Sequence, residues 1–81
     1  MTITIKLFAI LRDKAGVSEA SFNLPQGATI STAAESLATK FPAIRDHLPR
    51  IAYALNREYA SSTMELHDGD ELALIPPVSG G

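Results

Sequence analysis

Residues 29–42, TISTAAESLATKFP, carry the most regular apolar pattern in the chain. Apolar side chains recur at intervals of three and four residues, so a helix would place them in one stripe. Thr29 can cap the start of that helix by accepting a hydrogen bond from an early backbone N–H, and Pro42 ends it. The stretch therefore predicts one amphipathic helix with a single face to bury. Its stripe consists of Ile30, Ala33, Ala34, Leu37, Ala38 and Phe41.

Segments that alternate between polar and apolar residues lie on both sides of this helix and predict strands. Residues 2–11 and 19–24 precede the helix and predict an antiparallel hairpin. Residues 51–56 and 71–75 follow it, and an Asp-Gly-Asp turn at 68–70 introduces the last strand. The order strand, strand, helix, strand, strand indicates an α+β domain, in which one main helix packs on one face of a mixed sheet. The predicted core consists of Ile3, Ile5, Leu7, Phe22, Leu24, Leu37, Phe41, Leu55, Leu72 and Leu74.

Composition excludes several classes of function. The chain has 81 residues, a net charge of −2 and no cysteine. This length corresponds to one domain, and the lack of cysteine excludes disulfides, thiolate metal sites and cysteine nucleophiles. The charges are scattered along the chain, so we expect no nucleic-acid surface. No apolar run approaches the roughly 20 residues of a membrane span, and His47 and His67 lack the spacing of metal ligands, so we expect no membrane partner, no bound metal and a cytoplasmic location.

The last six residues, 76–81, read PPVSGG and follow the final predicted strand. The prolines stiffen the base of this segment, whereas the terminal glycines have no Cβ and can enter a channel too narrow for other residues. Residues 77–81 reach at most roughly 17 Å beyond the sheet. We therefore divide the chain into a domain at 1–76 and a flexible Gly-Gly tail at 77–81, with the carboxylate of Gly81 as the candidate reactive group. A frayed terminus without function is the simpler alternative.

This ending resembles the C-terminal signature of the MoaD family, the small sulfur-carrier subunits of molybdopterin synthase. The similarity extends to the start of the chain and to the third predicted strand. It implies a β-grasp, ubiquitin-like fold, which agrees with the α+β prediction made from the pattern of elements. The matching residues are DGD at 68–70, ELALI at 71–75, PPVSGG at 76–81, Leu7-Phe8-Ala9 with Arg12 and Gly16, and Ala54-Leu55-Asn56.

The resemblance also implies a mechanism. A ubiquitin-activating-like adenylyltransferase uses ATP and Mg²⁺ to adenylate the carboxylate of Gly81, and sulfur then replaces AMP to give a thiocarboxylate. The tail enters the large subunit of molybdopterin synthase, where sulfur passes to precursor Z (cyclic pyranopterin monophosphate). The implied assembly is a heterotetramer of two small and two large subunits, in which this chain binds no cofactor and is not catalytic alone. The inserted segment consists of Pro76, Pro77, Val78, Ser79 and Gly80.

A second group of residues is interpreted as a docking patch. The alternation in the first predicted strand places Phe8 and Ile10 on the outer face of the sheet, opposite the helix, and Ile75 falls on the same face near the base of the tail. Contiguous apolar patches mark interfaces, and the resemblance supports Phe8, Tyr59 and Ile75 as partner-facing. Arg12 is either a solvated loop charge or a contact to a partner.

Two other functions fit the same residues. The first is a carrier of the same kind that supplies thiamin or cysteine synthesis, although the PPVSGG ending favours the molybdopterin branch. The second is a ubiquitin-like module that binds partners noncovalently and performs no chemistry. In that second case, deletion of Gly81 leaves function intact.

Overall fold

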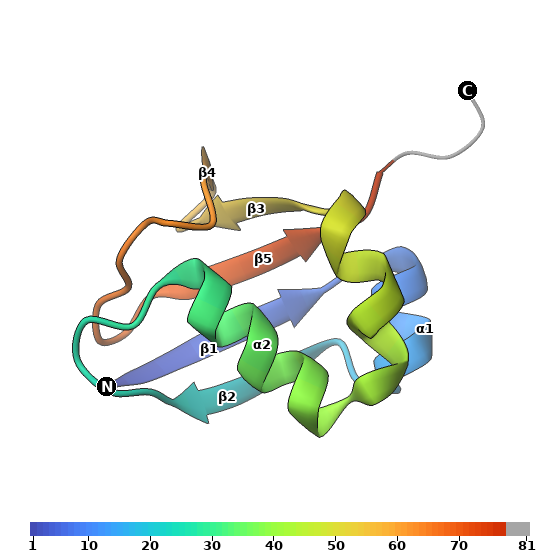
Figure 1. The fold of residues 1–81 in the computed structure, drawn as a ribbon, viewed down its shortest axis with the longest axis horizontal. Helices are drawn as coiled ribbons and strands as arrows, with labels where there is room; N and C mark the ends of the chain where they lie inside the picture. Colours follow the sequence, from blue (N-terminus) through green and yellow to red (C-terminus); the bar gives the residue numbers. More distant parts are fainter. Residues whose placement is uncertain (78–81) are drawn as a thin grey trace.

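The computed structural model describes residues 1–77, which form a five-stranded sheet with helices packed against it (Figure 1). The elements are β1 (Thr2–Leu7), α1 (Ala9–Ala15), β2 (Glu19–Asn23), α2 (Ile30–Lys40), the 3₁₀ helix η1 (Pro42–Arg50), β3 (Ala52–Leu55), β4 (Glu58–Ala60) and β5 (Glu71–Ile75). The strands lie in the order β2-β1-β5-β3-β4, in which β1 and β5 are parallel and the other neighbours are antiparallel. The predicted α+β class with a mixed sheet is confirmed.

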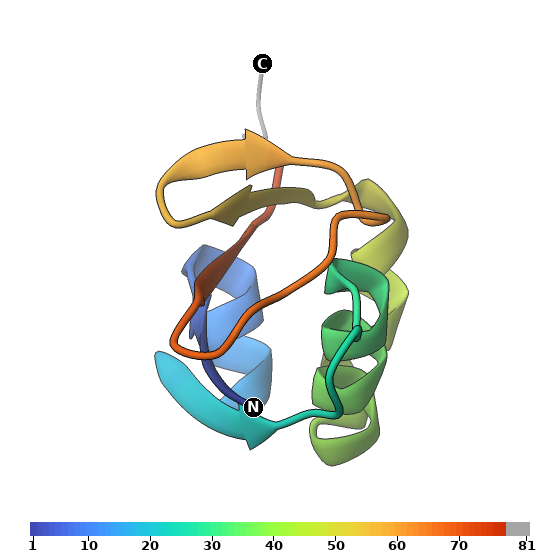
Figure 2. The same cartoon turned by 90° about the vertical axis from the view of Figure 1, so that its left-hand side faces the viewer.

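Helix α2 forms where the apolar stripe predicted it. The side chain of Thr29 caps its start, with Oγ1 accepting a hydrogen bond from the backbone N–H of Thr32 at 3.3 Å. Ile30 and Leu37 are completely buried, because the striped face of α2 packs on the sheet. Figure 2 shows α2 and η1 on the side of the core opposite β1 and β5. The face of the sheet that packs against α2 is called the inner face below, and the opposite face is called the outer face.

The predicted strand at residues 2–11 is wrong in its second half. The chain leaves the sheet after Leu7, and Phe8 precedes helix α1 as its N-cap residue. Ala9 has φ 51°, a left-handed conformation that a strand cannot contain. Leu11 falls on the same side of the predicted strand as Ile3, Ile5 and Leu7, although the predicted core omits it. It is completely buried, because α1 presents it to the core. Its burial fits a strand as well as a helix, so the alternation alone does not separate the two.

Strand β4 is absent from the sequence prediction. It is only three residues long and pairs with β3, so that Tyr59 lies opposite Ala54. The two strands are joined by Asn56 and Arg57, which have φ 50° and 72°. Positive φ at both central residues is the geometry of a tight hairpin turn, for which Asn-Gly is the usual sequence signal. Because Arg57 stands where this signal has glycine, the sequence does not predict the hairpin.

The core differs from the predicted set at its margins. Ile3, Ile5, Leu7, Leu24, Leu37, Leu72 and Leu74 are buried as predicted. Phe22, Phe41 and Leu55 are only partly buried and pack against the edge of the core. Four residues outside the predicted core, each at most 1% exposed, are also buried: Leu11, Ile30, Ile44 and Leu66. Ile30 belongs to the predicted helical stripe, whereas the burial of Ile44 and Leu66 depends on tertiary packing and had no signal in the pattern.

The Asp-Gly-Asp turn fixes where β5 begins. The carboxylate of Asp68 accepts a hydrogen bond from the backbone N–H of Thr2 at 2.7 Å. Asp70 accepts one from the side-chain amide of Asn56 at 3.0 Å, and Asn56 in turn accepts one from the N–H of Glu71, also at 3.0 Å. The turn therefore joins β1, β5 and the β3–β4 hairpin. Its aspartates act in turn formation, as predicted, and they hold β5 in register.

Candidate functional site

The predicted tail leaves the sheet from its middle. β5 lies between β1 and β3, and its last residue, Ile75, pairs with Ala52. Pro76 is half-buried and Pro77 is exposed. The remaining predicted tail residues, Val78, Ser79, Gly80 and Gly81, lie outside the described residues. The structure therefore describes the base of the predicted tail, at Pro76 and Pro77, and the surface around it.

A groove, called the sheet groove below, lies on the outer face beside this point. Its floor is made of the short side chains of Ala73 on β5 and Ala54 on β3, which are partners in the sheet, and Lys6 on β1 flanks Ala73 on the other side. Longer side chains surround these alanines and leave a hollow of about 400 Å³. The lining residues are Lys6, Phe8, Ala54, Arg57, Tyr59, Glu71, Ala73 and Ile75.

The structure brings the three predicted docking residues together in this groove. Tyr59 is 80% exposed and Phe8 is 46% exposed, while Ile75 is half-buried. They come from three separate segments of the chain, and their proximity follows from the strand order. Large exposed hydrophobic side chains that share one hollow are typical of a protein-binding surface.

Two other predicted positions lie elsewhere. Arg12 is exposed in the last turn of α1 and does not line the sheet groove. Ile10 was predicted on the outer face beside Phe8, and that prediction is wrong. Because the chain turns into α1 after Phe8, Ile10 lies on the helix and lines a different recess, next to Pro76 and Pro77.

Charged residues form part of the groove's rim. The ammonium of Lys6 lies 3.8 Å from the Glu71 carboxylate, and both side chains are partly exposed. An exposed pair of this kind contributes little to stability, so its main effect is to fix the charges beside the apolar floor. Arg57 adds a second cation from the hairpin turn. Sequence reasoning missed Lys6 and Arg57; for Lys6 the signal was its place on the outer face of the first strand.

The described residues contain few features of other kinds of site. Among residues 1–77, no group of three or more His, Cys, Asp or Glu side chains is arranged to hold a metal ion. His67 Nδ1 lies 4.0 Å from Asp70 Oδ2 in the turn before β5. Burial raises the pKa of the Tyr53 phenol, which faces the core rather than the groove. Within the described part of the chain, no helix has the length and apolar character to cross a membrane.

Fold and site together define a class: a small β-grasp domain whose chain end leaves the middle of the sheet next to an apolar groove. The model of the ThiS family matches residues 5–81, and the chain belongs to that family. Two curated relatives are each described as a molybdopterin synthase sulfur carrier subunit. The one from Arabidopsis thaliana is 37% identical and spans 98% of this chain and 82% of its own length. The one from Chlamydomonas reinhardtii is 39% identical over the full length of both chains. The predicted membership of a MoaD-type family is confirmed.

Solved structures confirm the fold. SAMP1 from Haloferax volcanii superposes with a TM-score of 0.94 at 32% identity, and the match covers all of both chains. A protein–protein complex of subunits 1 and 2 of molybdopterin-converting factor from Helicobacter pylori also matches. Its TM-score is 0.71 at 21% identity over the whole of both chains, which is a likeness of fold. The ubiquitin-like β-grasp fold predicted from the resemblance is confirmed.

Proposed function

We propose that this chain is the sulfur carrier subunit of a molybdopterin synthase. The observation that carries the proposal is the geometry of the exit: β5 is the central strand of the sheet and ends beside an exposed apolar groove, just before Pro76 and Pro77. A carrier needs these two parts next to each other, a docking surface and a projecting end. The relatives with the same description support the assignment to this pathway.

The reactive group in this proposal is the α-carboxylate of Gly81. On the activating enzyme, a carboxylate oxygen attacks the α-phosphorus of ATP, and pyrophosphate leaves to give the acyl adenylate. Sulfur supplied by that enzyme system at the sulfide level, as hydrosulfide, then attacks the carbonyl carbon. The bond from this carbon to the AMP oxygen breaks, AMP leaves, and loss of the proton from sulfur gives the thiocarboxylate. ATP and Mg²⁺ are bound by the adenylyltransferase, and this chain binds no cofactor.

The domain then delivers the sulfur. The sheet groove docks on the large subunit, and the segment from Pro76 to Gly80 enters that subunit and places the sulfur at precursor Z. Transfer of the sulfur to the pterin and addition of water at the carbonyl carbon return Gly81 to its carboxylate. We place the reaction in the cytoplasm, in a heterotetramer of two small and two large subunits. Proline limits the freedom of the tail at its base, and glycine fits a narrow channel at its end.

Intact-mass measurement tests the proposal. The chain is incubated with the activating enzyme, ATP, Mg²⁺ and a sulfur source, and its mass should rise by one oxygen-to-sulfur exchange at Gly81. A chain lacking Gly81 is the control and should not change. No mass change with an activating enzyme that modifies another carrier would refute the carrier function. Undiminished biological function after deletion of Gly81 would instead support a noncovalent ubiquitin-like module.

A carrier for thiamin or cysteine synthesis is the second candidate, and the match to the ThiS family model supports it. Both candidates use the same activation chemistry, so the acceptor separates them. The thiocarboxylated chain is offered to the large subunit with precursor Z, and separately to a thiazole synthase with its substrate. We expect sulfur transfer with the first acceptor; transfer only with the second would reassign the pathway.

A further inference from the structure

A second recess, called the tail-base cleft below, lies beside the exit of the chain. It has a volume of about 460 Å³ and is formed by α1, by the end of η1 and by the two prolines after β5. Ile10 is 38% exposed there, in spite of being a large hydrophobic residue. The lining residues are Ala9, Ile10, His47, Arg50, Pro76 and Pro77.

The cleft and the sheet groove are lined by consecutive residues at two places in the chain. Phe8 lines the groove while the next two residues line the cleft, and Ile75 lines the groove while the two prolines line the cleft. Ala9 follows Phe8 at the first of these places, where the chain passes from the groove into helix α1. Its φ of 51° is unfavourable for a residue with a Cβ, and such conformations cluster at functional sites. Both recesses therefore adjoin the base of the predicted tail, the groove at Ile75 and the cleft at Pro76.

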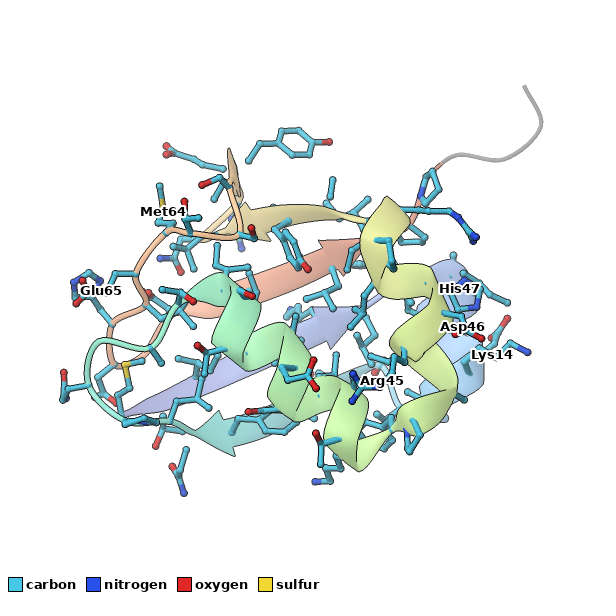
Figure 3. All side chains as sticks on the ribbon, viewed as in Figure 1. Lys14, Arg45, Asp46, His47, Met64 and Glu65 are labelled. Carbon is cyan, nitrogen blue, oxygen red and sulfur yellow. The ribbon has the colours of Figure 1, made fainter. Side chains whose placement is uncertain are left out.

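The described residues that line the cleft include one cation, Arg50, and no Asp or Glu. The other lining residues are His47 and apolar side chains. Within residues 1–77, no ion pair involves Arg50, whereas Arg45 on the same helix lies 2.9 Å from a carboxylate oxygen of Glu35. In Figure 3, His47 lies at the end of the molecule where the chain leaves β5, and Arg45 lies toward α2. An apolar hollow with a free cation on its rim complements an apolar segment that carries an acidic side chain.

We propose that the tail-base cleft docks an apolar, carboxylate-bearing segment of the large subunit, located at the mouth of the channel that receives the tail. The proposal rests on the proposed function, because it identifies the partner as the protein that accepts the tail. In this arrangement the large subunit contacts the chain on both sides of its exit. The apolar part of the segment covers Ile10 and the prolines, and its carboxylate pairs with Arg50.

Charge reversal tests the proposal. The affinity of the full chain for the purified large subunit is measured by calorimetry at low and at physiological salt, for wild type, Arg50→Glu and Arg45→Glu. Both variants change the net charge by the same amount, but only Arg50 lines the cleft. We expect Arg50→Glu to weaken binding about tenfold and to reduce its salt dependence, with Arg45→Glu within about twofold of wild type. Arg50→Lys should stay close to wild type, and thermal unfolding verifies that each variant is folded.

Equal affinities of Arg50→Glu and Arg45→Glu would overturn the proposal while leaving the carrier function standing. Failure of the wild-type chain to bind the large subunit would overturn the proposed function itself. The same variants are also tested for adenylation by the activating enzyme. If Arg50→Glu loses adenylation but keeps normal affinity for the large subunit, the cleft binds the activating enzyme. That result would refute the proposal that a segment of the large subunit occupies the cleft.

Discussion

The two faces of the sheet differ sharply although the same strands build both. On the inner face, Ile5 and Leu72 are neighbours on β1 and β5, and neither is exposed. On the outer face, Ala73 and Ala54 are neighbours on β5 and β3 and form the floor of the sheet groove. Because alternate residues of a strand point to opposite faces, one strand can serve the core and the proposed docking surface independently. Stability and partner binding should therefore respond to different substitutions in the same strand.

The largest expected effect is a loss of stability from the inner face. Leu72→Ala removes a completely buried side chain next to the α2 layer, and such truncations cost about 2–5 kcal/mol of unfolding free energy. Urea denaturation measures this loss. Ile75→Ala, on the outer face of the same strand, is the matched control and should cost clearly less, because Ile75 is only half-buried. Equal losses at the two positions would break the distinction between the faces.

The second effect is on binding from the outer face. Phe8→Arg places a charge in the sheet groove and should weaken binding to the large subunit at least about tenfold, as expected for an apolar anchor in an interface. The unfolding midpoint should hardly change, since Phe8 is 46% exposed and makes no side-chain cap to α1. Val17→Arg, at another exposed hydrophobic residue outside the groove, is the control. Wild-type affinity of Phe8→Arg would remove the groove from the proposed interface.

The third effect concerns the hairpin at the groove's rim. Arg57 has φ 72° in a turn that favours glycine, so Arg57→Gly should raise the unfolding free energy by about 0.5–1 kcal/mol. Arg12→Gly, within helix α1, is the opposing control and should lower it by about 1 kcal/mol. Chemical denaturation reads both changes. If Arg57→Gly stabilises the chain and also weakens binding to the large subunit, the arginine is retained for its charge in the groove. If Arg57→Gly destabilises the chain, the positive φ at this position does not strain the arginine backbone.

The smallest effect is a pH dependence from the inner face. Burial raises the pKa of the Tyr53 phenol above its ordinary value of 10.0, so the unfolded chain loses this proton first. The contribution of the protonated Tyr53 to the unfolding free energy is complete at pH values below the pKa of Tyr53 in the unfolded chain. It is lost as the pH rises toward the higher pKa of Tyr53 in the folded chain. Thermal unfolding between neutral and strongly alkaline pH should show a shallower decline for Tyr53→Phe than for wild type. Tyr59→Phe, at a residue 80% exposed, should reproduce the wild-type decline; an equal change in both variants would refute the assignment to burial.

Local signals in the sequence account for much of the fold. The stripe of α2, the cap at Thr29 and the alternation of the inner strands need only the periods of helix and strand, so they could be predicted. The pattern failed where periods coincide or where an element is too short. Leu11 suits both an extended strand and helix α1, and only the left-handed backbone at Ala9 separates the two.

The sequence indicates which residues make the proposed docking patch, but it does not indicate the shape of that surface. Phe8, Tyr59 and Ile75 line one groove, and their role in docking stays a prediction. Its depth depends on Ala54 and Ala73 lying side by side on strands that are distant in sequence. No local pattern encodes that adjacency, because it arises from the parallel pairing of β1 with β5 and the return of β3 beside β5.

The sequence by itself determined the core residues of β1, α2 and β5, where α2 begins and which family the ending resembles, because these follow from periodicity and local chemistry. Only the tertiary structure decided that the chain end leaves the sheet between a groove and a cleft. The reason is physical: β5 reaches its central place through pairing with both β1 and β3, and that pairing brings Phe8, Arg50 and Pro76 around one exit. The proposed carrier function depends on this arrangement.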